Sequence, residues 1–383
     1  MTFYNHLTRS LLFLFLLQFC VFGFGEPITV PGAPELPAKA YFLMDANSGK
    51  VLAEHNANGK LAPASLTKIM TVYVAFHELK NGNLALTDPV TVSKKAWQTG
   101  GSRMFIQVDT KVEVEQLLKG IIISSGNDAS VALAEHIAGD ESTFAQLMNQ
   151  HATRLGMTNT HFTDGTGLPD PNHYSSARDL AILTRALIRE FPEYYAWHAI
   201  REFKYNKITQ VNRNKLLWRD SSVDGVKTGY TEDAGYCLVA SAIKEDMRLI
   251  SVVLGSQSTN TRASQNQALL NYGFRFYATH QLYKANESLA EARIWKGEKT
   301  VLQLGVPDGL YVTIPRRRFD DLQATVQVDE KIMAPVTAGE QHGTLAITLA
   351  DEPFTTVPLA ALETIPEGGI FRRIYDGALL LFK

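Results

Sequence analysis

Three short motifs in this 383-residue chain combine nucleophilic, basic and amide side chains. They are Ser65-Leu66-Thr67-Lys68, Ser125-Gly126-Asn127 and Lys227-Thr228-Gly229. A serine hydroxyl is a poor nucleophile unless a nearby base removes its proton, and a lysine amine acts as that base only when it is neutral. The motifs therefore indicate nucleophilic serine chemistry supported by lysine, provided that the fold brings them together.

The first motif has a spacing that suits a catalytic pair. Apolar residues at helical spacing predict a helix within residues 63–82. Lys68 then lies one turn after Ser65, so their side chains are neighbours, and the start of the helix adds a positive potential that favours an alkoxide. A second Ser-x-x-Lys match, from Ser241 to Lys244, falls at the end of a predicted strand. Positions i and i+3 of a strand do not share a face, so this match has no catalytic geometry.

The other two motifs can supply the remaining parts of an acyl transfer. Desolvation and neighbouring positive charge lower the pKa of a lysine, and Lys227 is a candidate source of that charge for Lys68. Ser125 can relay protons between the lysines and the leaving group, and Asn127 can hold a substrate amide. Gly229 allows a substrate backbone to pair with the edge of a strand.

The elements that must position these motifs belong to an α/β domain, predicted over residues 26–280. Helical periodicity is present between the predicted strands, over residues 112–125, 128–139, 141–156 and 177–191. A hairpin is predicted before this block, over residues 40–58. Two adjacent strands are predicted after it, over residues 226–246 and 247–256, and a closing helix over residues 262–280. Strands at both ends with helices between them predict a sheet whose first and last strands are neighbours.

A smaller all-β domain is predicted over residues 281–365, where short alternating stretches replace the helical periodicity. Residues 366–383 contain a C-terminal amphipathic helix. About 14 residues span roughly 21 Å, short of the roughly 30 Å of a hydrocarbon core, so this helix can lie in a membrane interface but cannot cross it. The alternative is a terminal helix that docks on its own β domain.

An export signal is predicted over residues 1–25. Arg9 precedes a nearly unbroken apolar run over residues 11–24, and a small residue follows. An uncleaved transmembrane anchor is the alternative, although polar and glycine residues interrupt the run. Cleavage would remove Cys20 and leave Cys237 without a partner, which suits an exported bacterial protein that has no internal disulfide.

The overall composition limits the classes of partner. Lys and Arg number 37 against 39 Asp and Glu, for a net charge of −2, so no basic field is available to hold nucleic acid. The ten histidines lack metal-binding spacing, and we expect neither a metal nor a cofactor. We expect Asp128 to cap its helix or form an ion pair, and Cys237 to pack as a small apolar residue.

The three motifs, in this order, resemble those of the penicillin-recognising serine enzymes. The chain is more closely similar to the low-molecular-mass penicillin-binding proteins that are D-alanyl-D-alanine carboxypeptidases. Matching phrases include SGNDASVALAE, NHYSSARDLAILTRALIREFP and VDGVKTGYTEDAGYCLVASA, and the likeness continues through the β-rich domain and the tail. It implies a DD-peptidase-like catalytic domain in which an antiparallel sheet packs against a helical block.

This resemblance also implies a reaction and a location. A peptidoglycan stem peptide would acylate Ser65, release its terminal D-alanine and be freed by water, and β-lactams would acylate the same serine. Arg262 would bind the terminal carboxylate together with Lys227 and Thr228, and Arg213 is a weaker candidate for that electrostatic environment. The protein would be periplasmic, attached through its C-terminal helix to the outer face of the cytoplasmic membrane.

One residue departs from the pattern, since Tyr230 follows the Lys-Thr-Gly motif where many relatives have histidine. Its backbone N–H, with that of Ser65, remains a candidate for the oxyanion hole. Two other functions stay open. A β-lactamase of class A needs a glutamate in the loop over residues 163–175, which contains none. A catalytically idle cell-wall-binding protein would not need its intact serine and lysine residues.

Overall fold

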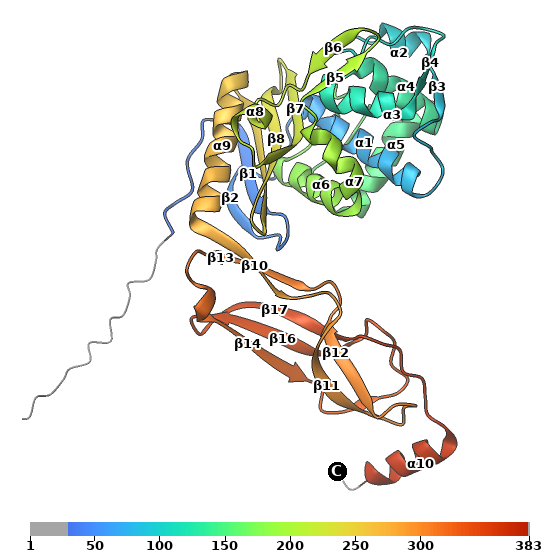
Figure 1. The fold of residues 1–383 in the computed structure, drawn as a ribbon, viewed down its shortest axis with the longest axis vertical. Coiled ribbons are helices and arrows are strands. Elements are labelled where there is room, and N and C mark those ends of the chain that lie inside the picture. Colours follow the sequence, from blue (N-terminus) through green and yellow to red (C-terminus); the bar gives the residue numbers. More distant parts are fainter. Residues whose placement is uncertain (1–29, 382–383) are drawn as a thin grey trace, which may run out of the picture. The chain divides into compact units, whose positions relative to one another are not determined.

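The computed structural model describes residues 30–381. The export signal predicted over residues 1–25, with Cys20, lies outside the described residues, as do Phe382 and Lys383. The first domain is built on an antiparallel sheet in the order β2-β1-β9-β8-β7 (Figure 1). Its strands are β1 (Ala40–Asp45), β2 (Val51–His55), β7 (Val223–Thr231), β8 (Gly235–Lys244) and β9 (Met247–Ser256).

The sheet joins the two ends of this domain. β1 pairs with β9, which confirms that the first and last strands are neighbours, and the hairpin predicted over residues 40–58 is present as β1 and β2. The expectation for residues 226–246 was incomplete, because this segment holds two strands, β7 and β8, rather than one. Gly235 has a φ of 69°, a left-handed conformation that suits glycine, and it turns the chain between them.

Helices cover both faces of the sheet, with α9 on one face and the remaining helices mainly on the other (Figure 1). They are α1 (Lys68–Lys80), α2 (Lys94–Gln98), α3 (Val114–Lys119), α4 (Asn127–Ala138), α5 (Glu141–Arg154), α6 (Ala177–Glu190), α7 (Pro192–Tyr195), α8 (Leu216–Arg219) and α9 (Thr259–Phe276). Single helical turns are η1 (Ala64–Thr67), η2 (Gly120–Ser124) and η3 (Ala196–Ala199), and small hairpins are β3 (Pro89–Thr91) with β4 (Lys111–Glu113) and β5 (Glu202–Tyr205) with β6 (Ile208–Val211).

Two predicted helices differ from the observed ones. The segment over residues 112–125 continues from α3 into η2, a π-helical turn, and its first residues belong to β4. The closing helix α9 ends at Phe276, and the residues that follow form a strand. The helix predicted within residues 63–82 is central to the core, since every α1 residue from Lys68 to Phe76 is buried. A buried helix therefore carries Lys68, and the turn η1 directly before it carries the rest of the first motif.

The second domain is all β. Its main sheet has the order β14-β16-β17-β12-β11-β15, and β10 pairs separately with β13. These strands are β10 (Tyr277–Tyr283), β11 (Glu287–Trp295), β12 (Val301–Val306), β13 (Leu310–Pro315), β14 (Leu322–Val328), β15 (Ile332–Met333), β16 (Gln341–Leu349) and β17 (Glu352–Ala361), with a short helical turn η4 (Phe319–Asp321) before β14. Buried apolar side chains of β12, β13 and β16 contribute to its apolar clusters.

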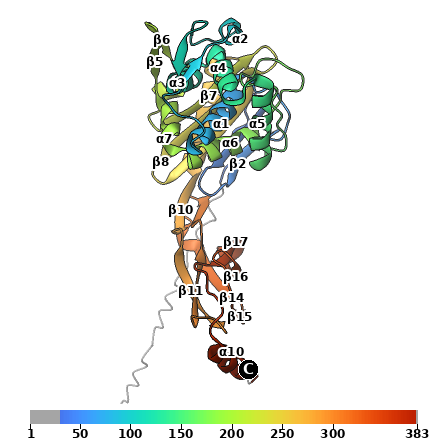
Figure 2. The same cartoon turned by 90° about the vertical axis from the view of Figure 1, so that its right-hand side faces the viewer.

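The C-terminal helix α10 (Ile370–Leu379) lies beside the end of β11 and docks by its polar side (Figure 2). Asp376 is fully buried, accepts a hydrogen bond from the Lys296 backbone N–H at 2.7 Å and pairs with Arg372 at 3.2 Å. The apolar side is uncovered, with Phe371 88% and Ile374 67% exposed. Between residues 30 and 381, no helix has the length and apolar character required to span a membrane.

Candidate active site

The first motif forms a pair at the start of α1. Ser65 lies in η1, and the Nζ of Lys68 is 3.1 Å from the Oγ of Ser65. The Lys68 amine is buried and has two further partners, the Oδ1 of Asn127 at 2.7 Å and the backbone carbonyl of Thr166 at 2.6 Å. The left-handed backbone of Ala64, with a φ of 48°, turns the chain directly before Ser65. The spacing thus gives the contact expected from the sequence.

This arrangement suits a lysine that works as a base. A neutral amine has two N–H groups and one lone pair. When the two carbonyl oxygens accept the N–H groups, the lone pair is left for the hydroxyl proton of Ser65. Burial lowers the pKa of Lys68 to about 7 against the opposing charge of Asp164, and Arg213 lowers it further. Lys68 is therefore neutral in a large fraction of molecules near pH 7.

The second and third motifs meet on the other side of Ser65. Lys227 donates to the Oγ of Ser125 at 2.9 Å and to the carbonyl of Thr228 at 3.0 Å. Ser125 has a left-handed backbone with a φ of 61°, between η2 and α4, a strained conformation of the kind that concentrates at functional sites. Burial above all, and then Lys68, holds the pKa of Lys227 well below its usual range. The influence found is therefore that of Lys68 on Lys227, whereas the charges that shift the pKa of Lys68 itself are those of Asp164, Arg213 and Asp128.

Asn127 has a different environment from the one expected for a substrate-binding amide. Its Oδ1 accepts from Lys68, and its Nδ2 donates to the carbonyl of Gly100 at 2.7 Å. Both ends of the amide are engaged, so its first effect is to orient Lys68. A substrate amide would have to replace or share the bond to Gly100.

β7 is an edge strand and carries the third motif along the site. At Gly229, an added Cβ would lie 2.9 Å from the carbonyl oxygen of Pro63 and 3.2 Å from the Cβ of Ala64. This glycine therefore allows β7 to pack against the turn that holds Ser65, a structural requirement beyond the substrate approach inferred from the sequence. The next residue, Tyr230, is 52% exposed, and its ring lies 4.4 Å from that of Tyr236.

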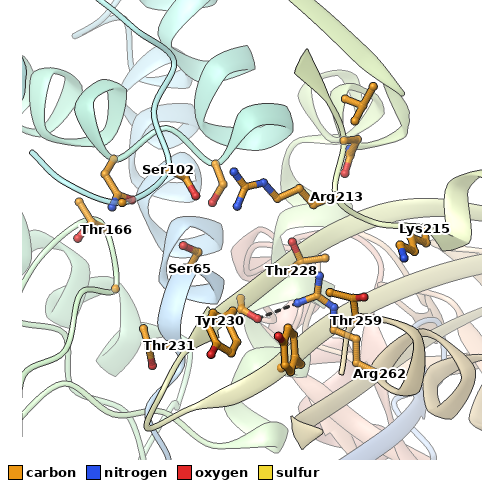
Figure 3. A pocket seen from close by; sticks show the side chains of 18 of the residues that line it. Ser65, Ser102, Thr166, Arg213, Lys215, Thr228, Tyr230, Thr231, Thr259 and Arg262 are labelled. Atoms are coloured by element: carbon orange, nitrogen blue, oxygen red, sulfur yellow. Dashed lines mark hydrogen bonds between the residues drawn. The ribbon is translucent and has the colours of Figure 1, made fainter. Parts of the chain in front are cut away.

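Two arginines bring permanent positive charge to the site (Figure 3). Arg262 is buried and donates to the carbonyls of Gly229 at 2.9 Å and Cys237 at 3.3 Å. Burial lowers the pKa of Arg262 to about 10, which leaves it charged at neutral pH. Arg213 is partly buried, and burial lowers its pKa too.

These residues line one cavity of about 740 Å³. Its walls come from η1, Ser125, α4, β7, α8, α9 and the loops before α6 and α8. The lining residues include Ser65, Ser125, Asn127, Arg213, Thr228, Tyr230 and Arg262, of which Figure 3 labels Ser65, Arg213, Thr228, Tyr230 and Arg262. Lys68 and Lys227 are buried beneath it. The structure thus brings every predicted site residue to one cleft. Within residues 30–381, no cluster of three or more histidine, cysteine, aspartate or glutamate side chains could hold a metal ion.

Sequence reasoning missed the contribution of one loop. The carbonyl of Thr166 is a partner of Lys68, and Asp164 organises the turn around it. The Asp-Gly-Thr-Gly run is a turn signal that could have drawn attention to this loop. Asp128 was expected to serve its own helix. Its carboxylate instead accepts N–H groups from residues 104–106 and anchors the loop before β4, although it also contacts the Ala129 N–H.

Comparisons with known proteins agree with this geometry. Residues 28–258 match the family model described as D-alanyl-D-alanine carboxypeptidase, and residues 277–367 match that of the penicillin-binding protein 5 C-terminal domain. The chain is 46% identical to the D-alanyl-D-alanine carboxypeptidase DacC of Escherichia coli over 100% of this chain and 98% of that protein. It is 43% identical to DacA of the same organism, over 92% of this chain and 90% of that protein.

Solved structures give the same result. Penicillin-binding protein 5 from Haemophilus influenzae has a TM-score of 0.83 and 40% identity, covering 88% of this chain and 100% of that one. Penicillin-binding protein D2 from Listeria monocytogenes, solved in an ampicillin-bound form, has a TM-score of 0.59 and 27% identity. That likeness covers 64% of this chain and 100% of the Listeria chain, which is consistent with a shared catalytic domain.

Proposed function

This chain belongs to the family of D-alanyl-D-alanine carboxypeptidases, and on that premise we propose that Ser65 is the nucleophile of its reaction. The protein is a serine-type hydrolase that removes the terminal D-alanine from peptidoglycan stem peptides, and β-lactams acylate it. The observation that carries the residue assignment is the 3.1 Å contact between Lys68 and Ser65, beside two carbonyl oxygens that orient the amine.

Acylation begins with proton transfer from the Oγ of Ser65 to the Nζ of Lys68. The oxygen attacks the carbonyl carbon of the penultimate residue, and the backbone N–H groups of Ser65 and Tyr230 stabilise the oxyanion. The C–N bond then breaks, and the amine of the leaving D-alanine takes a proton that passes from Lys68 through the hydroxyl of Ser125, which Lys227 holds in place. Ser65 is left as an ester of the shortened peptide.

Hydrolysis of the ester repeats the scheme with water. The Lys68 amine accepts a proton from the water, which attacks the ester carbonyl, and Lys68 returns that proton to the Oγ of Ser65 when the C–O bond breaks. The terminal carboxylate of the substrate is assigned to Thr228, Lys227 and Arg262, since these groups bring hydroxyl and cationic donors to one end of the cleft. Asn127 and Gly229 complete the peptide-binding wall, and Arg213 adds positive potential.

The test uses the full chain with a fluorescent penicillin and a peptide that ends in D-Ala-D-Ala, beside the variant S65A. The wild type is expected to retain the label and release D-alanine, and S65A to do neither. Labelling of S65A would show that another residue is the nucleophile. Rapid loss of label without D-alanine release would indicate a β-lactamase, and a wild type that takes up no label would contradict the assignment altogether.

We also propose an export signal over residues 1–25, a catalytic domain over 26–280, a β-rich domain over 281–365 and a membrane-association segment over 366–383. The uncovered apolar side of α10, opposite the buried Asp376, supports attachment to the outer face of the cytoplasmic membrane. Deletion of residues 370–383 should move the protein from sedimented membranes to the soluble fraction. Persistent sedimentation of the deleted form would contradict the attachment.

A further inference from the structure

The loop over residues 163–174 packs against the face of α1 that presents the catalytic lysine. Three hydrogen bonds join the loop to the helix: Lys68 Nζ to Thr166 O (2.6 Å), Thr71 Oγ1 to Gly165 O (2.7 Å) and Thr67 Oγ1 to His173 Nε2 (2.8 Å). Positions 67, 68 and 71 share one side of a helix, so the loop lies along the helix at the level of the reacting amine. The mechanism above uses only one atom of this loop, the carbonyl oxygen of Thr166.

Asp164 fixes the direction of that carbonyl. Its Oδ1 accepts three hydrogen bonds, from the Thr166 N–H at 2.6 Å, the Gly167 N–H at 2.7 Å and the Thr166 Oγ1 at 2.7 Å. Gly167 has a φ of 79°, and an added Cβ there would lie 1.8 Å from the carbonyl oxygen of Ala64, so the turn fits closely against η1. A carboxylate with three donors on one oxygen holds a turn more strongly than a neutral acceptor does.

His173 ties the same loop to the residue before Lys68. Its side chain is buried, and its Nδ1 accepts the Thr163 N–H at 3.2 Å. In a neutral ring this leaves the proton on Nε2, which then donates to Thr67. The Nδ1 also lies 3.4 Å from the Oδ2 of Asp164, so a protonated ring would pair with the carboxylate. The aspartate and the histidine thus contact each other. His173 contacts Thr67 directly, and Asp164 is linked to Lys68 through the Thr166 turn.

We propose that Asp164 and His173 are positioning residues for the base Lys68, acting through the carbonyl of Thr166 and the hydroxyl of Thr67. The inference rests on the proposed function, because it assumes that Lys68 takes the proton of Ser65. Asp164 holds the carbonyl that occupies one N–H of the amine, and its negative charge faces the amine across the turn. His173 keeps the helix start in register with the loop.

The charges around Lys68 determine the direction in which the pKa of Lys68 should shift when Asp164 is replaced. Four charged groups face the amine: Asp164 from the loop, Asp128 from α4, Arg213 from the segment before α8 and Lys227 from β7. Burial lowers the pKa of Lys68, and the Asp164 carboxylate is the strongest influence that raises it. Removal of that charge lowers the pKa of Lys68, so the amine becomes neutral, and active as a base, at lower pH.

The experiment measures acylation of the full chain by a fluorescent penicillin from about pH 5 to about pH 9. With a pKa of about 7, Lys68 is neutral in about one tenth of wild-type molecules at pH 6, and the rate should fall accordingly. The variant D164N keeps the shape of the side chain. We expect its plateau rate to fall, while its rate at pH 6, as a fraction of that plateau, rises about two- to threefold.

Asp170→Asn is the matched control, because Asp170 lies exposed in the same loop and its carboxylate accepts the Asn172 N–H, a bond that an asparagine oxygen can also accept. Its profile should coincide with that of the wild type. A D164N profile that falls by the same factor at every pH, with an unchanged midpoint, would show that Asp164 only supports the loop, and would overturn the proposal.

His173 is tested by two variants with the same readout, and these carry the test should D164N not fold. H173A removes the donor to Thr67 and should lower the plateau rate about tenfold. H173Q retains an N–H donor and should recover most of that loss. Equal rates in H173A, H173Q and the wild type would contradict the role of His173.

The wild-type profile distinguishes a failure of the roles assigned to Ser65 and Lys68 from a failure of the role assigned to Asp164. A wild type without a fall in rate at acid pH, or a labelled S65A, would contradict the assignment of Ser65 and Lys68 itself. A normal wild-type profile with unshifted D164N would leave that assignment intact and contradict only the role of Asp164.

Discussion

The Nζ of Lys68 has three oxygen neighbours, but when the amine is neutral it has only two N–H groups to donate to them. Asn127 and Thr166 supply carbonyl oxygens at 2.7 Å and 2.6 Å, and Ser65 lies at 3.1 Å. The two shorter contacts take the N–H groups and so direct the lone pair at Ser65, the proposed nucleophile. The chemistry of this residue is therefore determined by the direction of its hydrogen bonds as well as by its burial.

A prediction at the residue scale concerns Arg262. R262Q should lower kcat/KM for a D-Ala-D-Ala peptide about 10- to 100-fold, because a charged donor near the carboxylate end of the cleft is lost. Steady-state release of D-alanine measures the effect. R262K is the control that keeps the charge but not the two bonds to Gly229 and Cys237, so it should fall between the wild type and R262Q. An R262Q rate equal to that of the wild type would remove Arg262 from substrate binding.

Sequence patterns predicted the reacting groups but not their neighbours. The contact between Ser65 and Lys68 could be predicted because residues at positions i and i+3 at the start of a helix are neighbours. The bond from Lys68 to Thr166 joins residues 98 positions apart and uses a backbone carbonyl, which every residue possesses. No side-chain pattern marks such an atom, so it could be found only once the loop was placed against α1.

At the scale of elements, close approach between η1, β7 and the loop before α6 determines the position of Ser65. Gly229 lets β7 reach Pro63 and Ala64, and Gly167 lets the loop reach Ala64 from another direction. The turn that carries Ser65 is thus held on two sides by glycines that have no side chain to separate the backbones.

Substitution of Gly167 should therefore destabilise both the fold and the site. G167A combines a φ of 79° with a clash at 1.8 Å, and we expect it to lower the free energy of unfolding by at least about 2 kcal/mol and to slow acylation. The matched control is G139A, since Gly139 has a φ of 84° but open space around its Cβ position. This control should lose only about 1 kcal/mol. Equal losses in urea unfolding would show that the contact with Ala64 is unimportant.

The elements themselves were largely predictable, with failures where local signals conflict. The amphipathic segments 141–156 and 177–191 form α5 and α6, as predicted, because a long pattern with the helical period is compatible only with a helix that has one buried face. The boundary between β7 and β8 was missed because the third motif leaves β7 with few apolar residues that would mark it as a separate strand. The π-helical turn before Ser125 was missed because the apolar residues Ile121 to Ile123 continue the pattern of α3, and this pattern does not distinguish a π-helical turn from an α-helical one.

At the scale of the whole molecule, α10 is connected to the second domain through a buried carboxylate. Asp376 accepts a hydrogen bond from the Lys296 N–H and forms ion pairs with Arg372 and Arg293. This anchoring fixes which side of α10 is uncovered. A helix held only by apolar contacts would instead have turned that side inward.

D376A should loosen this helix without affecting catalysis. Loss of a buried acceptor that has charged partners should lower the free energy of unfolding by about 1–3 kcal/mol. Hydrolysis of a soluble D-Ala-D-Ala peptide should be unchanged, because none of the residues assigned to the reaction belongs to the second domain. Thermal unfolding and steady-state kinetics on the same sample measure the two quantities, and a change in kcat/KM would show that α10 influences the first domain.

Cys237 lies in β8 opposite Gly229, directly behind the catalytic strand, and is fully buried. Burial raises the pKa of its thiol to about 11, so only about one molecule in ten thousand carries the thiolate at pH 7. Since the thiolate is the form that reacts with oxidants and disulfides, this sulfur is chemically inert. A cysteine beside the cleft is therefore compatible with oxidising surroundings, because its buried thiol does not form mixed disulfides readily.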